Sequence, residues 1–340
     1  MTRYPVITPQ ISRRTMLQVS ATAAMGLAAP RLGFAEAFAA HSPKPLRGLF
    51  PIGETPFTES DKIDLECLAN QVTFCNLGGV RGIAWPQIAS GWSNLSTVER
   101  FSGAEALLAA GKGGKTAIVI GVQTKGNDLP ASIEYAKHAA RNGADAIISL
   151  PPDGDNPAIL EYYKAIGRAT ELPLIVQSIG DKMTVDFIVE MFHSIPTMRV
   201  VKDEAGNPLK RITEIRTKTD DKLAVFAGNG VRLMIDELQL GFAGYCPVVS
   251  LADVYEQAFE LYQQGKHREA FDMFGRILAF ISISHASQYL MVARGIFKET
   301  SMFRPSPGMG TGVKQTAPTE EDKKIIRQAL ITYMKPYLKA

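Results

Sequence analysis

The sequence predicts an α/β protein, a (β/α)8 TIM barrel with a C-terminal helical extension. From residue 48 onward, short β-rich runs alternate with helical segments, an order typical of a parallel sheet covered by helices. Most of the strand candidates are continuous apolar runs, as expected for parallel strands that are buried on both faces. We therefore expect a leader over 1–39, the barrel over 46–265 and a helical region over 266–340.

Eight strand candidates follow one another, the number that closes such a barrel. They are LFPIGETPF (49–57), GIAWPQ (82–87), TAIVIGV (116–122), DAIISLP (145–151), PLIVQSI (173–179), MRVVKD (198–203), LAVFAGNG (223–230) and GYCPVVS (244–250). A doubly wound open sheet is the alternative fold. It usually has fewer strands and a Gly-rich turn after the first, which FPIGETPF does not provide.

Helical periods fill the gaps between these strands. In DLECLANQVTFCNLG, Leu65, Leu68, Val72 and Cys75 share one face, and the segment ends at a glycine pair. LPASIEYAKHAARNG ends at Gly143, a common C-terminal stop signal. After the eighth strand we expect four helices, the first of which completes the barrel, at 251–265, 267–284, 288–301 and 319–337.

The N-terminus resembles a twin-arginine export signal. SRRTMLQVS places Arg13 and Arg14 before Leu17, and a short, weakly apolar run follows. AFA (37–39) and GFA (33–35) are candidate cleavage sites, so we expect a periplasmic protein that meets the twin-arginine translocase during export. A disordered basic tail or a mitochondrial transit peptide is the alternative interpretation. Residues 1–39 and the whole chain both have a net charge of +3, so the mature part is nearly neutral and suggests no nucleic-acid partner.

We expect neither a metal nor a cofactor. The five histidines are scattered and none has ligand spacing to a cysteine or to another histidine. GKGGKT (111–116) lacks the first glycine of a phosphate-binding loop and precedes a strand rather than following one. Gly228 and Asn229, in the GNG after the seventh strand candidate, are better placed to bind an anionic group, although a plain tight turn explains them equally well.

The C-terminal ends of barrel strands converge on one face, where active sites form. The residues expected there are Thr55, Gln87, Gln123, Asp153, Gln177, Ser178, Lys202 and Asn229. Lys202 is the one cation among them and follows an apolar strand, and burial favours the neutral amine that attacks a carbonyl. Alternation places Val200, Lys202 and Glu204 on one face, so a structural Lys202–Glu204 ion pair is the competing explanation.

Several segments together resemble the dihydrodipicolinate synthase / N-acetylneuraminate lyase family of Schiff-base aldolases. They are RGLFPIGETPFTESDKIDLECL, GADAIISLPP, LPLIVQSIG, VVKDEAG and FAGNG…LGFAGYCPVVS, and the resemblance covers roughly residues 46–300. It implies a Schiff-base lysine in VVKDEAG, which is Lys202 here. It also implies a homo-oligomer, commonly a tetramer with a helical C-terminal domain.

The chain departs from that family in three blocks. QIASG (87–91) stands where the family has a Gly-Thr-Thr-Gly-Glu carboxylate clamp, so that Ser90 and backbone N–H groups are the remaining candidate donors. PPDG (151–154) replaces a Pro-Tyr-Tyr block and puts Asp153 at the place of the proton-relaying tyrosine. Gln177 and Ser178 stand where relatives carry Tyr-Asn.

Two functional hypotheses follow. The first is an exported lyase, an aldolase or dehydratase, that acts on a 2-oxo acid or sugar-acid derivative through an imine on Lys202, with Asp153 as a substitute acid/base. The second is a non-catalytic periplasmic barrel that binds a small acid. A metal-dependent barrel hydrolase is a third class, against which the lack of a His/Asp cluster counts.

Overall fold

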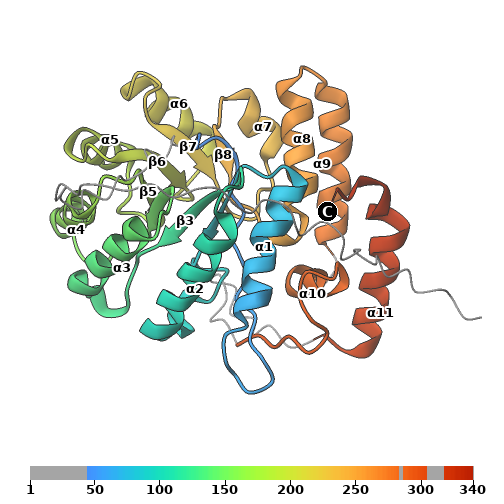
Figure 1. Ribbon diagram of the computed structural model, residues 1–340. Helices are drawn as coiled ribbons and strands as arrows, with labels where there is room; N and C mark the ends of the chain where they lie inside the picture. Colours follow the sequence, from blue (N-terminus) through green and yellow to red (C-terminus); the bar gives the residue numbers. More distant parts are fainter. Residues whose placement is uncertain (1–43, 283–285, 305–317, 340) are drawn as a thin grey trace, which may run out of the picture. The chain divides into compact units, whose positions relative to one another are not determined.

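Within residues 44–282, 286–304 and 318–339, which the computed structural model describes, eight parallel strands form a barrel. Each strand pairs with its neighbour in the chain from β2 to β8, and β8 pairs with β1 (Figure 1). The strands are β1 (Gly48–Leu49), β2 (Gly82–Trp85), β3 (Ala117–Gly121), β4 (Ala146–Ser149), β5 (Leu174–Ser178), β6 (Met198–Asp203), β7 (Ala224–Ala227) and β8 (Gly244–Tyr245). The predicted (β/α)8 fold is confirmed.

The barrel closes between β1 and β2 through a short bridge beyond the end of β1. The Ala84 N–H donates to the Pro51 carbonyl at 2.9 Å, and the Gly53 N–H donates to the Ala84 carbonyl at 3.0 Å. The prediction of one strand over 49–57 was too long, since Pro51 has no N–H to give to a ladder and the chain leaves the sheet after Ile52. The released segment carries Glu54 and Thr55 over the mouth of the barrel.

Helices separate the strands, as the alternating pattern predicts. They are α1 (Leu65–Gly78), α2 (Thr97–Gly111), α3 (Leu129–Arg141), α4 (Asn156–Ala169), α5 (Val185–Ser194), α6 (Pro208–Lys218), α7 (Met234–Gln239) and α8 (Ala252–Gln263). Side chains of Asp64, Ser96 and Asp155 accept backbone N–H groups at the starts of α1, α2 and α4. The expected stop at Gly143 is present, with φ of 83° directly after α3.

The C-terminal helices are α9 (His267–Ile281), α10 (Ala286–Ala293) and α11 (Glu320–Ala329), and Figure 1 shows them gathered with α8 beside the barrel. The helix expected over 288–301 was placed too far along the chain. Gly295, with φ of 73°, ends that helix, and its N–H bonds the Val292 carbonyl at 2.9 Å. In the described part of the chain no helix combines the length and apolarity needed to cross a membrane.

Two apolar layers hold the barrel together. One lies inside it and includes Phe50, Val200 and Phe226, and the other lies between the strands and the helices. The Phe50 and Phe226 rings lie 5.2 Å apart between their centroids. Gly82 makes room for them, because a Cβ there would lie 2.2 Å from the Phe50 ring. Because the interior is filled with side chains, a ligand can bind only at the ends of the strands.

Candidate active site

Lys202 lies near the C-terminal end of β6, beside Gln177 on β5 and Phe226 on β7. Val200 belongs to the apolar cluster inside the barrel, and Val201 belongs to the layer beneath the helices. The alternation inferred from the sequence therefore holds, and Lys202 is on the interior face. Its side chain is 6% exposed, so an apolar strand carries an almost fully buried ammonium to the mouth.

The Lys202 ammonium forms an ion pair with Glu204. The Nζ atom lies 2.6 Å from Glu204 Oε2, and the glutamate side chain is also 6% exposed. The structural ion pair that the sequence offered as a competing explanation is therefore present. It gives Lys202 a counter-ion, and it also places a carboxylate in direct contact with the amine.

Two hydrogen-bond donors besides Lys202 orient the Glu204 carboxylate. The Asn229 N–H donates to Oε1 at 2.8 Å, and Gln177 Nε2 donates a short hydrogen bond to Oε2. Gly228 allows this approach, because a Cβ at that position would lie 1.9 Å from Glu204 Oε1. Gly228 and Asn229, which we predicted as an anion site, thus hold an anion of the protein itself.

The opposite face of β6 carries a second ion pair. Arg211 donates to Asp203 Oδ2 through Nε at 2.8 Å and to Oδ1 through Nη2 at 2.9 Å. The same Nη2 lies 3.4 Å from Ser178 Oγ. The predicted site residue Ser178 is buried in this cluster, on the side of the strand away from Lys202.

Glutamines fill the mouth next to β2 and β3. Gln87 Nε2 donates to Gln123 Oε1 at 3.0 Å, and Gln123 Nε2 donates to the Pro86 carbonyl at 2.8 Å. Arg100 on α2 lies behind them and donates to the carbonyls of Gln123 and Gly121. No local pattern pointed to Arg100, because the carbonyls that it binds are more than twenty residues away along the chain.

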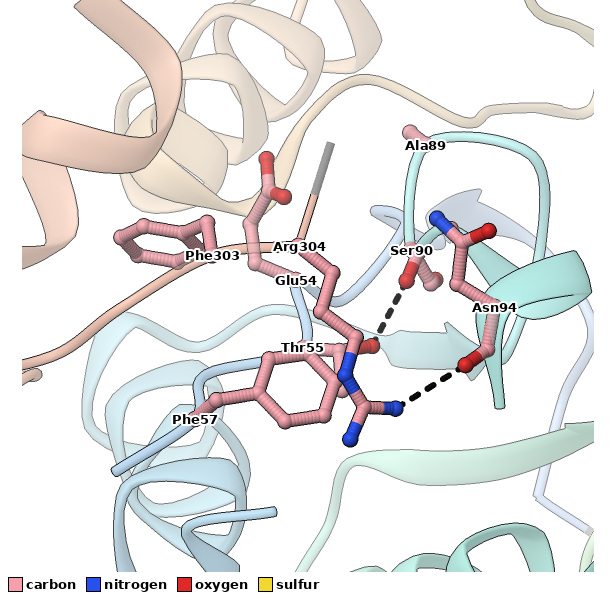
Figure 2. Close-up of a pocket in the computed structure, with 9 residues that line it drawn as sticks. Glu54, Thr55, Phe57, Ala89, Ser90, Asn94, Phe303 and Arg304 are labelled. Atoms are coloured by element: carbon pink, nitrogen blue, oxygen red, sulfur yellow. Dashed lines mark hydrogen bonds between the residues drawn. The ribbon is translucent and has the colours of Figure 1, made fainter. Parts of the chain in front are cut away.

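Thr55 and Ser90 line a small pocket at the β1–β2 side of the mouth (Figure 2). The Thr55 hydroxyl donates to the Ser90 carbonyl at 2.7 Å, and the Ser90 hydroxyl donates to the Gly53 carbonyl at 2.5 Å. Trp85 Nε1 donates to the Thr55 oxygen at 2.9 Å. In Figure 2 the Ala89 methyl points away from this cluster. Both predicted ligand-binding hydroxyls therefore stabilise the loop itself.

Asp153 lies apart from the ion pair, on the loop after β4. Its side chain is exposed, and its backbone N–H and carbonyl bond the Asn127 side chain at 2.9 and 2.7 Å. Among the described residues, no hydrogen bond or ion pair joins the Asp153 carboxylate to Lys202 or Glu204. Its role as an acid/base remains a prediction.

The pKa values of Glu204 and Cys246 at the mouth shift in opposite directions. Burial raises the pKa of Glu204, but the Lys202 charge and the hydrogen bonds from Lys202, Asn229 and Gln177 outweigh this effect and hold the pKa below its usual value. Burial raises the pKa of the Cys246 thiol, which also senses Lys202 and Glu204, to about 12. At neutral pH the site therefore holds a carboxylate and a neutral thiol.

Comparisons with known proteins identify the family of this chain. The model of the Dihydrodipicolinate synthetase family matches residues 45–297. A 4-hydroxy-tetrahydrodipicolinate synthase of Methanosarcina mazei is 30% identical over 213 residues, which are 60% of this chain and 69% of the relative. The corresponding enzyme of Oceanobacillus iheyensis is 26% identical over 232 residues, which are 66% and 77% of the two chains.

Solved structures show the same fold. The sialic acid aldolase of Ruminococcus gnavus superimposes with a TM-score of 0.75 at 20% identity, over 86% of this chain and 99% of the other. A dihydrodipicolinate synthase of Rhodopseudomonas palustris gives 0.73 at 20% identity, over 85% and 98%. On the family match, the chain belongs to the Dihydrodipicolinate synthetase family and is a lyase of that type.

Proposed function

We propose that this protein is an exported lyase that binds a 2-oxo acid or a sugar-acid derivative as an imine on Lys202. The observation that carries the proposal is the place of that amine. Its Nζ is buried at the C-terminal end of a barrel strand and lies 2.6 Å from a carboxylate that can exchange a proton with it. Aldol cleavage, aldol addition and dehydration can all proceed from such an imine.

Buried amide oxygens at the mouth of the barrel favour a hydroxylated substrate. The Oε1 atoms of Gln87 and Gln177 are buried and accept no hydrogen bond from the described residues, so hydroxyl groups of a sugar acid would suit them. The Thr55 and Ser90 hydroxyls are engaged within the protein, as are the backbone N–H groups of Gln87, Ser90 and Gly91. We therefore assign a substrate carboxylate to the N–H groups of Ile88 and Ala89.

A panel of 2-oxo acids with borohydride tests the proposal. Intact-mass measurement should show one substrate mass added irreversibly to the wild-type protein. A sugar-derived acid should label at lower concentration than pyruvate if hydroxyl contacts help to bind the substrate. Absence of labelling across the whole panel would contradict the lyase proposal.

The second candidate is a barrel that binds a small acid without chemistry. The Lys202–Glu204 pair favours it, because an ammonium that is neutralised in a buried pair serves as a structural contact. Tight acid binding without borohydride labelling would support this alternative.

Export is a proposal as well, since residues 1–39 lie outside the described part of the chain. Replacing both Arg13 and Arg14 with lysine should leave the precursor in the cytoplasm, and fractionation with immunoblotting measures this. Periplasmic delivery of the double variant would contradict the twin-arginine signal. Sedimentation of the mature protein tests the proposed homotetramer.

A further inference from the structure

Imine formation needs a neutral amine, and the structure holds Lys202 next to one specific carboxylate. The distance of 2.6 Å between Nζ and Glu204 Oε2 is that of a charge-assisted hydrogen bond, along which a proton can pass. Among the described residues, Glu204 is the one hydrogen-bond acceptor of this ammonium. The other N–H groups of Lys202 are therefore left for a substrate.

Glu204 is oriented for this contact by groups far away in the sequence. Asn229, 25 residues downstream, holds Oε1 through its N–H at 2.8 Å, and Gln177, 27 residues upstream, donates to Oε2. Gly228 leaves the space that the carboxylate occupies. These two donors engage both oxygens of the carboxylate, and Oε2 also contacts the Lys202 ammonium.

Three other groups near the mouth that could carry a proton are unsuited to exchange it with Lys202. Asp203 points to the opposite face of β6, where Arg211 binds both of its oxygens. Asp153 is exposed on another loop. The Cys246 thiol stays protonated, because burial raises its pKa to about 12.

We propose that Glu204 is the catalytic acid/base for Lys202, taking a proton from its ammonium and returning it to the leaving oxygen of the carbonyl substrate. This role rests on the proposed function. It differs from the substitute acid/base that the sequence suggested, because the carboxylate comes from the strand that carries the lysine and not from the loop after β4.

The protons and charges of the step balance. Lys202 gives one proton to Glu204, and the neutral Nζ forms the N–C bond while the carbonyl π electrons move to oxygen. A second nitrogen-bound proton moves to that oxygen and gives a carbinolamine. Glu204 then returns its proton to the carbinolamine hydroxyl, the C–O bond breaks and water leaves. The products are a protonated imine, a carboxylate and water.

Glu204→Gln tests this role, because glutamine keeps the shape and an acceptor for Asn229 but cannot take up a proton. We expect the rate of irreversible labelling by pyruvate and borohydride, measured by intact mass, to fall at least about a hundredfold. Glu161→Gln is the matched control, since Glu161 pairs with Lys164 at 2.9 Å on the surface, and its rate should not change.

A second reaction separates proton transfer from simple positioning. Acetic anhydride at trace level acetylates any neutral amine, and peptide mapping reads Lys202 alone. In the Glu204→Gln protein Nζ no longer contacts a carboxylate but keeps its place on β6, so acetylation of Lys202 should be at least as fast as in the wild type. Imine formation should become slower in the same protein, and Glu204→Asp should recover part of it.

The remaining outcomes would contradict either the acid/base role of Glu204 or the proposed function. Equal rates of imine formation in the wild-type and Glu204→Gln proteins would overturn the acid/base role of Glu204 but not the proposed function. A fall in both imine formation and acetylation would do the same. A fall in both would mean that Glu204 only holds Lys202 in place. A wild-type protein that no 2-oxo acid labels would overturn the proposed function, and with it the role of Glu204. Melting curves by circular dichroism confirm that each variant is folded.

Discussion

The Arg294–Asp253 and Lys202–Glu204 ion pairs are both buried, and they are built differently. Arg294 donates from Nη1 and Nη2 to Asp253 Oδ1 and Oδ2 at 2.8 and 2.7 Å, and the two side chains are 1% and 0% exposed. The Ser250 carbonyl accepts a further bond from Arg294 at 2.7 Å, and the Lys339 N–H donates to Asp253 at 2.9 Å. This pair joins α10 to α8.

The Lys202–Glu204 pair has a single contact, and only its carboxylate is held by several neighbours. A bidentate arginine pair is rigid and cannot readily lose its proton, whereas a lysine can become neutral. The difference indicates that the C-terminal pair serves stability. On the proposed role of Glu204, the pair at the mouth keeps donors and a proton available for chemistry.

Asp253→Asn should show the largest effect on stability, because it removes the negative charge that Arg294 faces in a fully buried site. We expect the free energy of unfolding to fall by about 3–5 kcal/mol. Urea unfolding monitored by circular dichroism measures it. The exposed pair of Lys218 and Asp186 provides the control, and Asp186→Asn should change stability little. A loss below 1 kcal/mol for Asp253→Asn would remove the distinction drawn between the two pairs.

Glu237 on α7 sharpens the comparison, because it is buried and no ion pair joins it to a cation within the described part of the chain. It is 4% exposed, and burial, with a smaller effect of Asp236, raises its pKa from 4.5 to about 7. A carboxyl group whose folded-state pKa is raised contributes stability below its unfolded pKa, and that contribution is lost as pH rises through the folded pKa. Stability should therefore fall between pH 4.5 and 7, by about 3 kcal/mol from this group.

Urea midpoints at pH 5 and pH 8 measure this dependence. The Glu237→Gln protein should lose less stability over that interval than the wild type, because its side chain does not ionise. Glu171→Gln serves as the control at an exposed site and should keep the wild-type dependence. An unchanged dependence in Glu237→Gln would show that the carboxyl group is solvated or paired.

Local sequence patterns predict much of this fold. Continuous apolar runs located the strands, and alternation placed Lys202 and Val200 on the interior face of β6. Gly143 marked the end of α3 because few other residues adopt its backbone conformation. The helix expected to reach residue 301 ends earlier at Gly295, whose left-handed conformation the apolar period alone did not signal.

The hydrogen bonding at the mouth was less predictable, because it joins residues far apart in the chain. Thr55 and Ser90 have the right chemistry to bind a ligand, yet each bonds a backbone carbonyl 35 or more residues away. From the sequence, Glu204 was expected only to form an ion pair with Lys202. Its proposed acid/base role depends on Asn229 and Gln177, which only the folded barrel brings to it.

The central claim is that Lys202 is the nucleophile, and its variants require care. Lys202→Ala would leave Glu204 buried without its counter-ion, so the loss of function could reflect unfolding. The better variant combines Lys202→Met with Glu204→Gln, which removes both charges and keeps most of the volume. Lys164→Met is the matched surface control.

The most direct measurement is peptide mapping after reduction with borohydride in the presence of a labelling 2-oxo acid. The account expects one adduct, located on Lys202, in the wild-type and Lys164→Met proteins, and none in the folded Lys202→Met, Glu204→Gln protein. An adduct on another lysine, or labelling that persists in the double variant, would contradict it and leave Lys202 as a structural partner of Glu204.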